Sequence, residues 1–83
     1  MTLAAARTLI LTADMIAIRA AHAKLATKSG AAFDARDAAE ARQDWDAMEK
    51  AERAMKRHEA AEHALFCAID DATRLANTNV WLR

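Results

Sequence analysis

Turn-forming residues are almost absent from this chain, which has no proline and a single glycine, Gly30, among its 83 residues. A protein built from β-strands needs such residues at its turns, so their scarcity argues against a sheet. Alanine, which has the highest helix propensity of all residues, occurs 24 times. The chain is therefore predicted to be all-α.

Large apolar side chains are scarce, because alanine supplies more than half of the 54% of residues that are hydrophobic. A chain of this length forms one domain, over residues 1–83, and buries only about 60% of the surface that its unfolded form exposes. Such domains are usually stabilised by disulfides, a structural metal or self-association. The single cysteine, Cys67, excludes an internal disulfide and a four-cysteine zinc site. We therefore expect the protein to bind itself, as a homodimer or a higher oligomer.

The charges of the chain balance, since twelve basic and twelve acidic residues give a net charge of zero. This balance gives no reason to expect nucleic acid or a membrane as a partner. The longest apolar run, from Thr8 to Ile18, is interrupted by Asp14 and is shorter than the ~20 residues that a membrane span needs. We interpret this run as part of a structural helix rather than a targeting segment, and we expect a cytoplasmic protein.

Gly30 marks the strongest break in the sequence. Glycine readily takes the left-handed conformation that ends a helix. Lys24 and Lys28 precede it, and basic side chains interact favourably with the last turn of a helix. These signals predict a first helix over about residues 2–28.

A second helix is expected to begin soon after this break. Asp34 can cap its first turn, and Asp37 occupies the capping-box position three residues later. No glycine or proline follows, so the helix is predicted to run over about residues 34–76, with a short C-terminal tail at 77–83. An alternative is a break near Gln43 and Asp44, where Asp44 can cap a separate segment.

These two helices predict an antiparallel helical hairpin with a short first helix and a long second one. At a rise of ~1.5 Å per residue, the first helix spans roughly 40 Å and the second roughly 64 Å. The second helix therefore extends beyond the first from about His58 onward. Large apolar residues continue along this extension, at Leu65, Phe66, Ile69 and Leu75. A second chain is expected to cover them.

The first helix carries two apolar stripes, so we expect it to be covered on two sides. Small side chains allow close backbone approach, so one stripe is assigned to the second helix of the same chain. It consists of Ala6, Leu9, Ala13, Ile16, Ala20 and Ala23. The stripe of larger residues is assigned to a second copy, which gives a four-helix bundle. The predicted oligomer interface consists of Leu11, Met15, Ile18, Leu25, Leu65, Phe66 and Ile69.

Two polar residues, His58 and Glu62, interrupt the apolar seam of the second helix. Their spacing of four places both side chains on one face, where they can hold a metal ion, with His63 as a further ligand. The Glu-x-x-His spacing of di-iron bundles is absent. We favour the alternative that the pair forms hydrogen bonds within the bundle and fixes its register. A third interpretation is a pH response through the protonation of His58.

His63 and Cys67 also lie four residues apart, on the flank of the same helix. The pair is a usable zinc half-site, and the imidazole can activate the thiol as a nucleophile. Nothing in the sequence supplies an oxyanion site or a substrate cleft, so we interpret Cys67 as a small interface residue. We predict no catalytic residue, no cofactor and no resident metal, and hence no enzyme.

A short basic cluster lies on the face opposite the seam, at Lys50, Arg53, Lys56 and Arg57. Acidic residues four positions earlier are expected to pair with three of these cations: Asp46 with Lys50, Glu49 with Arg53 and Glu52 with Lys56. We therefore interpret the cluster as a solvated salt-bridge face. The alternative is a surface that contacts a nucleic-acid backbone.

The C-terminal tail carries Trp81 and Leu82, which can either close the end of the bundle or anchor a partner, since tryptophan is frequent in binding hot spots. Trp45, near the loop end of the seam, is expected in the core. We predict a small non-enzymatic homo-oligomer that binds and regulates a protein partner, as an adaptor or an inhibitor. The alternatives are a metal-binding four-helix bundle that uses His58 and Glu62, and a nucleic-acid-binding hairpin that uses the basic cluster.

Overall fold

A computed structural model describes the backbone of residues 1–81 and the side chains of residues 1–78. The described residues form three α-helices, α1 (Leu3–Leu11), α2 (Met15–Ala41) and α3 (Trp45–Trp81), and no strand. The all-α prediction is confirmed, although the helices number three rather than two. Leu82 lies outside the described residues, and so does the side chain of Trp81.

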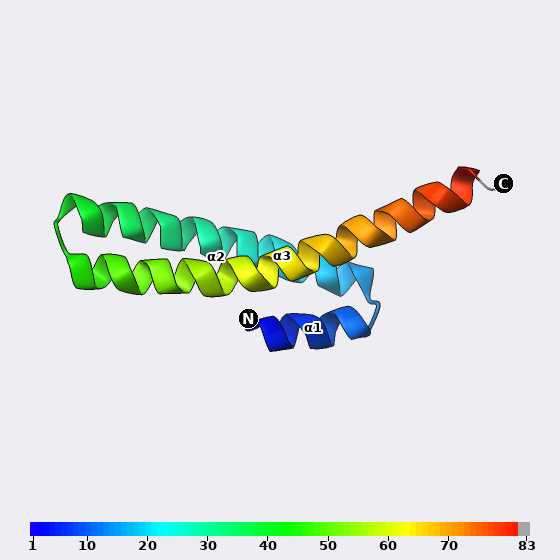
Figure 1. The fold of residues 1–83 in the computed structure, drawn as a ribbon, viewed down its shortest axis with the longest axis horizontal. Coiled ribbons are helices and arrows are strands. Elements are labelled where there is room, and N and C mark those ends of the chain that lie inside the picture. The colour runs from blue at the N-terminus through cyan, green and yellow to red at the C-terminus, as the bar shows by residue number, and fades with distance from the viewer. Residues whose placement is uncertain (82–83) are drawn as a thin grey trace.

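The two long helices lie side by side and run in opposite directions, joined by a short turn at residues 42–44 (Figure 1). The short helix α1 folds back from the start of α2 and packs mainly against α3. Beyond the α1–α2 turn, α3 continues as a protruding helix (Figure 1). The resulting shape is elongated, with principal extents of 59 × 23 × 15 Å.

Gly30 lies inside α2, so the predicted helix end at residue 28 is wrong, and so is the predicted helix start at residue 34. Gly30 has no positive φ angle, and a Cβ atom built on it would meet no other atom within 4 Å. Glycine in a helix interior costs only about 0.5–1 kcal/mol relative to alanine. The helix formers on both sides therefore carry α2 through this position.

The turn between α2 and α3 is the alternative break predicted near Gln43 and Asp44. Gln43 takes a left-handed φ of 57°, the conformation that the sequence led us to expect at Gly30. Asp44 then caps α3, because its Oδ1 accepts a hydrogen bond from the backbone N–H of Ala47 at 3.2 Å.

A second break, at residues 12–14, was not predicted. Like the first, it consists of a residue with a positive φ followed by an aspartate that caps the next helix. Ala13 has a φ of 55°, and Asp14 caps α2 by accepting a hydrogen bond from the Ala17 N–H at 3.1 Å. Thr12 stabilises the turn, since its hydroxyl donates to the Leu9 carbonyl at 2.6 Å and accepts from the Asp14 N–H at 3.2 Å. The predicted first helix is therefore two helices.

The C-terminal end of α3 also differs from the prediction, because the helix continues through residue 76 to Trp81. The weak helix formers in this stretch were expected to begin a tail. Thr78 instead donates its hydroxyl hydrogen to the Arg74 carbonyl at 2.9 Å. Such a bond satisfies the threonine hydroxyl without interrupting the helix.

The hydrophobic core is small and lies where all three helices meet. Its buried residues come from α1, α2 and α3, and they are Ala6, Ile18, Leu25, Ala61 and Leu65. Leu9, Ile10, Met15, Ala21 and Ile69 pack against this core and are half-buried. Two further alanines, Ala39 and Ala51, are buried outside this cluster.

In α2 the stripe of larger residues is buried or half-buried, and the stripe of small residues, which we expected to face the second helix, is exposed. Ile18, Leu25 and Leu65, which we expected at an interface between two chains, are instead buried within one chain. Ile16, which we expected to face the second helix, is 85% exposed. The larger stripe faces α3 because larger side chains gain more from burial, and the turn at residues 12–14 frees α1 to cover the other side of the core.

The same turn corrects our expectation about the extension of the long helix. Leu65 and Ile69 pack in the core cluster with residues of α1, so the first helical segment does reach them. Leu75 stays 65% exposed on the protruding part of α3. Trp45, expected in the core, is 58% exposed at the start of α3.

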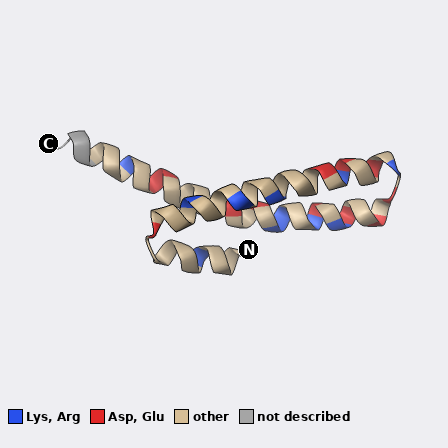
Figure 2. Cartoon of the chain, turned by 180° about the vertical axis from the view of Figure 1, so that it is seen from behind, with Lys and Arg blue, Asp and Glu red and all other residues tan. Residues whose placement is uncertain are grey.

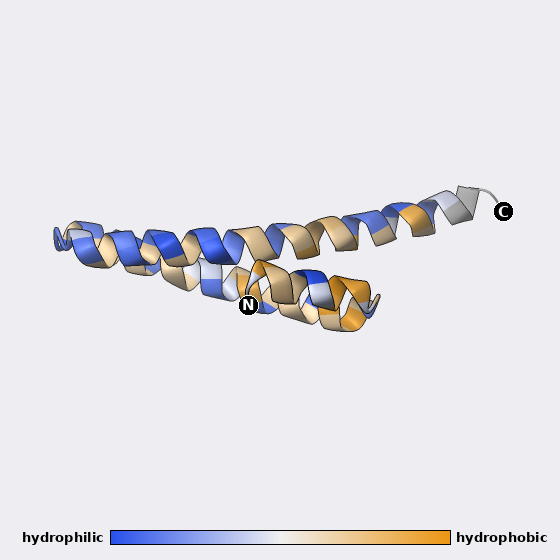
Figure 3. Ribbon diagram, turned by 60° about the horizontal axis from the view of Figure 1, so that its bottom comes forward, coloured by the Kyte–Doolittle hydropathy of each residue, from blue (hydrophilic) through white to orange (hydrophobic). Residues whose placement is uncertain are grey.

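Hydropathy is distributed unevenly along the molecule (Figure 3). Residues near the 42–44 turn are mostly hydrophilic, whereas α1 and the start of α2 are strongly apolar (Figure 3). Among the described residues, no helix combines the length and the apolar character that crossing a bilayer requires.

Candidate functional site

Glu62 joins α2 and α3 through polar contacts in a partly buried position. Its Oε2 accepts a hydrogen bond from the Ser29 hydroxyl at 3.1 Å, and its Oε1 lies 3.9 Å from Nε2 of His22. The His22 ring also lies 6.3 Å from the Phe66 ring, centroid to centroid. The favoured interpretation of Glu62, that it fixes helix register, therefore fits its contacts, but its partners are on α2 of the same chain rather than His58.

His58 has an unusual environment. Its Nδ1 atom is buried without a hydrogen-bond partner, the only such side-chain atom in the described part of the chain. Leaving a buried polar group unsatisfied costs about 1–3 kcal/mol, and functional sites are one place where this cost is found. His58 therefore has one enclosed ring nitrogen without a partner, and the residue also lines a pocket.

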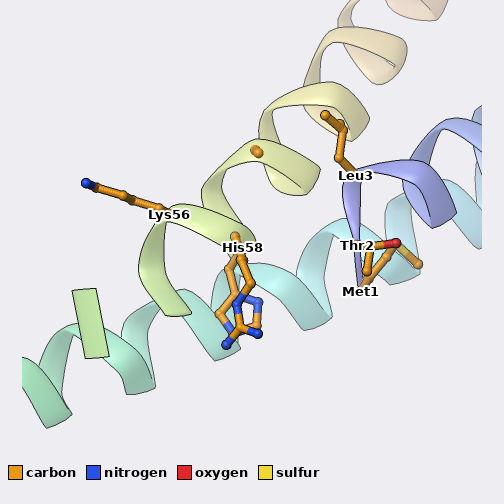
Figure 4. A pocket seen from close by; sticks show the side chains of 7 residues that line it. Met1, Thr2, Leu3, Lys56 and His58 are labelled. Carbon is orange, nitrogen blue, oxygen red and sulfur yellow. The ribbon is translucent and has the colours of Figure 1, made fainter. Parts of the chain in front are cut away.

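A pocket of about 490 Å³ lies beside His58, between the start of α1 and the middle of α3 (Figure 4). It is lined by Met1, Thr2, Leu3, Lys56, Arg57, His58 and Ala60. The lining combines apolar groups with cationic ones and contains no acidic side chain. The pocket was not foreseen from the sequence, because it depends on the unpredicted turn that returns α1 to α3.

The predicted metal alternative is not supported by the side-chain positions. Within the described residues, no three His, Cys, Asp or Glu side chains come close enough to hold a metal ion. The candidate ligands His58, Glu62 and His63 have separate environments: Glu62 contacts α2, and His63 contacts Cys67.

His63 and Cys67 form the pair that their spacing predicts. The Sγ atom of Cys67 lies 3.6 Å from Nε2 of His63, and both residues are exposed on α3. A shallow hollow of about 300 Å³ adjoins them, lined by His22, Glu59, Glu62, His63 and Phe66. The thiol has a basic neighbour here, but this open helix flank offers little enclosure for a substrate.

The basic cluster forms one surface of α3, which we call the basic surface. Lys50, Arg53, Lys56 and Arg57 are all exposed and line a common hollow of about 360 Å³. Figure 2 shows Lys and Arg bands along this part of α3, between the 42–44 turn and the middle of the helix. None of the four side chains forms an ion pair with another side chain of residues 1–78.

The ion pairs expected within the helix are therefore absent, and Glu52 shows why for one of them. Its Oε1 accepts a hydrogen bond from Nε of Arg36 on α2 at 2.9 Å. This hydrogen bond, together with the charges of Glu52, Glu40 and Asp37, raises the pKa of Arg36. Glu52 is thus directed across to α2 rather than along α3 to Lys56.

Exposed apolar residues gather around the α1–α2 turn, and we call this region the apolar end. Leu11 is 86% exposed and Ile16 is 85% exposed, one on each side of residues 12–14. Phe66 is 54% exposed on the neighbouring helix α3, which then protrudes with Leu75. Of the predicted interface residues, Leu11 and Phe66 are thus free to contact another molecule, and Met15 and Ile69 are half-buried.

Sequence reasoning also missed the contacts between α2 and α3. Once the turn is placed at residues 42–44, residues at similar distances before and after it face each other, and Arg36 and Glu52 each lie eight positions from Asp44. The signal that would have found this pair is the Asp44 cap, which we treated as an alternative.

No protein-family model matches this chain, and no curated protein or solved structure matches it.

Proposed function

We propose that this chain is a non-enzymatic helical protein that self-associates and binds a protein partner, as an adaptor or an inhibitor. The exposed apolar end carries the proposal. Leu11 and Ile16 are almost fully exposed, while the largest fully buried side chains among residues 1–78 are Ile18, Leu25 and Leu65. Apolar residues concentrated at one exposed site are typical of protein interfaces.

The surface area of the chain supports this proposal. Its accessible surface is 6116 Å². A compact monomer of the same mass exposes about 4,900 Å², which is roughly 1,200 Å² less. A standard interface buries about 800 Å² on each partner, so the excess is large enough to supply one.

The occupant that we propose for the apolar end is a second copy of this chain. The zero net charge imposes no overall repulsion between copies. In a two-fold arrangement, the protruding part of α3 from each copy lies on the apolar end of the other, so that Leu75 and Phe66 meet Leu11 and Ile16. Such an isologous contact gives a closed dimer with a four-helix core.

Sedimentation velocity of matched variants tests this proposal. Leu11→Glu places a charge in the proposed interface, whereas Ala35→Glu adds the same charge to an exposed site of α2 far from the apolar end. We expect the wild type and Ala35→Glu to sediment as dimers and Leu11→Glu as a monomer with unchanged helix content. Equal dissociation of the two variants, or none in Leu11→Glu, would place the interface elsewhere.

The protein partner is tested with the same pair of variants. A partner that uses the dimer or its apolar end is expected to bind wild type and Ala35→Glu equally and to lose affinity for Leu11→Glu. A glutamate at Ile18 would not serve this purpose, because Ile18 is 1% exposed and the variant would disrupt the core.

A further inference from the structure

Two hollows on α3 form one continuous surface. The pocket beside His58 and the basic surface share two lining residues, Lys56 and Arg57. All the ionisable side chains that line the two hollows are basic: Lys50, Arg53, Lys56, Arg57 and His58. A concave surface lined by one sign of charge attracts ligands of the opposite sign. Its ligand is therefore expected to be an anion.

Two acidic residues near this surface are directed toward α2 rather than toward its cations. Glu52 is held by Arg36 at 2.9 Å, and Glu62 is held by Ser29 at 3.1 Å. Asp46 is in the first turn of α3, and among the described side chains neither it nor Glu49 pairs with a basic residue. The four cations are therefore available to a ligand.

The spacing of the cations favours an extended anion over a single carboxylate. Lys50 and Arg57 are seven residues apart, which corresponds to ~10 Å along the helix. A strand with one phosphate about every 3.4 Å along its axis, the B-DNA value, places about four phosphates along this length. Arginine, present at positions 53 and 57, also matches phosphate geometry with two parallel hydrogen bonds.

The pocket at the end of this array suits a nucleobase. Its apolar groups come from Met1, Leu3 and Ala60, and His58 and Arg57 also line it. Unstacked bases in single strands pack on histidine rings and on arginine planes and form hydrogen bonds through their edges. His58 lines the pocket, so its ring is placed to pack against such a base.

We propose that this surface binds a single-stranded nucleic acid, with phosphates along Lys50, Arg53, Lys56 and Arg57 and one base in the pocket beside His58. A duplex binds less well, because its bases are paired and cannot enter the pocket. This proposal differs from our expectation from the sequence, which rested on ion pairs within α3 that the structure does not contain. It is independent of self-association, because the apolar end shares no residue with this surface.

Fluorescence anisotropy of labelled homopolymeric single strands, of DNA and of RNA, tests the proposal against a duplex of equal length. With four phosphate contacts, log K is expected to fall with log salt at a slope of about −3, a loss of about 50-fold between about 50 and 200 mM salt. Arg53→Ala is expected to make that slope shallower by about 0.7. His58→Ala is expected to weaken single-strand binding while leaving the slope unchanged.

Arg74→Ala is the matched control for Arg53→Ala, because it removes the same charge from an exposed site ~32 Å farther along α3 than Arg53. It is expected to leave affinity and slope unchanged. The proposal is overturned by an absence of binding at about 50 mM salt, by equal losses in Arg53→Ala and Arg74→Ala, or by full affinity in His58→Ala. It is also overturned if a glutamate-rich peptide binds through these residues and the oligonucleotides do not, since the partner is then an acidic protein segment.

Discussion

Arg36 of α2 and Glu52 of α3 contact each other at 2.9 Å, and they lie at equal distances in sequence from Asp44. Both side chains are about one third exposed, so the pair contributes little to stability. Its larger effect is on charge placement, because it keeps Glu52 away from the cations of α3. The pair thus connects the position of the turn to the properties of the basic surface.

This relationship predicts a coupling between two substitutions. Arg36→Gln releases Glu52, which can then pair with Lys56 one helical turn away, so oligonucleotide affinity is expected to fall by about 2-fold. In a Glu52→Gln background the same substitution is expected to have almost no effect, since no carboxylate is released. Anisotropy titrations of the four proteins measure the coupling, and equal effects in both backgrounds would contradict it.

Replacing Gly30 tests whether this residue lies inside a helix, because the sign of the change in stability differs between a helix interior and a helix end. Because Gly30 is helical, exposed and free of steric conflict, Gly30→Ala is expected to raise the free energy of unfolding by about 0.5–1 kcal/mol. Urea denaturation followed by circular dichroism measures the change. A destabilised variant would show that Gly30 ends a helix in the left-handed conformation.

At the two turns glycine is expected to be the more stabilising residue, in contrast to position 30. Ala13 and Gln43 have positive φ angles, which glycine adopts without strain. Gln43→Gly is therefore expected to stabilise the protein, by about 0.5–1 kcal/mol. Gln43→Val, which disfavours this conformation more strongly, is expected to destabilise it. Similar melting temperatures for the two variants would argue against a turn at this position.

The core assignment is tested by two isoleucines only two residues apart. Ile18 is 1% exposed and Ile16 is 85% exposed. Ile18→Ala is expected to cost about 2–5 kcal/mol of stability and Ile16→Ala less than about 0.5 kcal/mol. Both are measured by denaturation in the Leu11→Glu background, so that self-association does not contribute. A larger loss of stability for Ile16→Ala would indicate that Ile16, rather than Ile18, faces α3, as the sequence suggested.

The helical class followed from the sequence because it depends on local propensity, which alanine dominates at almost every turn. The helix boundaries were harder, since Gly30 permits a break without requiring one, whereas Ala13 and Gln43 adopt left-handed conformations that their residue types disfavour. The aspartates after them, Asp14 and Asp44, were the reliable signals. Each caps the helix that follows.

The candidate site was only partly predictable, because it depends on these boundaries. The basic residues 50, 53, 56 and 57 were found as a cluster from their helical spacing. Their freedom from ion pairs was not, because it depends on Arg36 of another helix. The pocket beside His58 was also beyond prediction, since Met1 and Leu3 reach α3 only through the turn at residues 12–14.

Sedimentation equilibrium of the wild-type chain at micromolar concentration tests self-association most directly. The chain has a mass of 9.1 kDa. We expect a mass of at least twice this value, because a chain with so small a core and an exposed apolar end is stabilised by a second copy. A mass of a single chain across the concentration range, with the helices fully formed, would contradict the account.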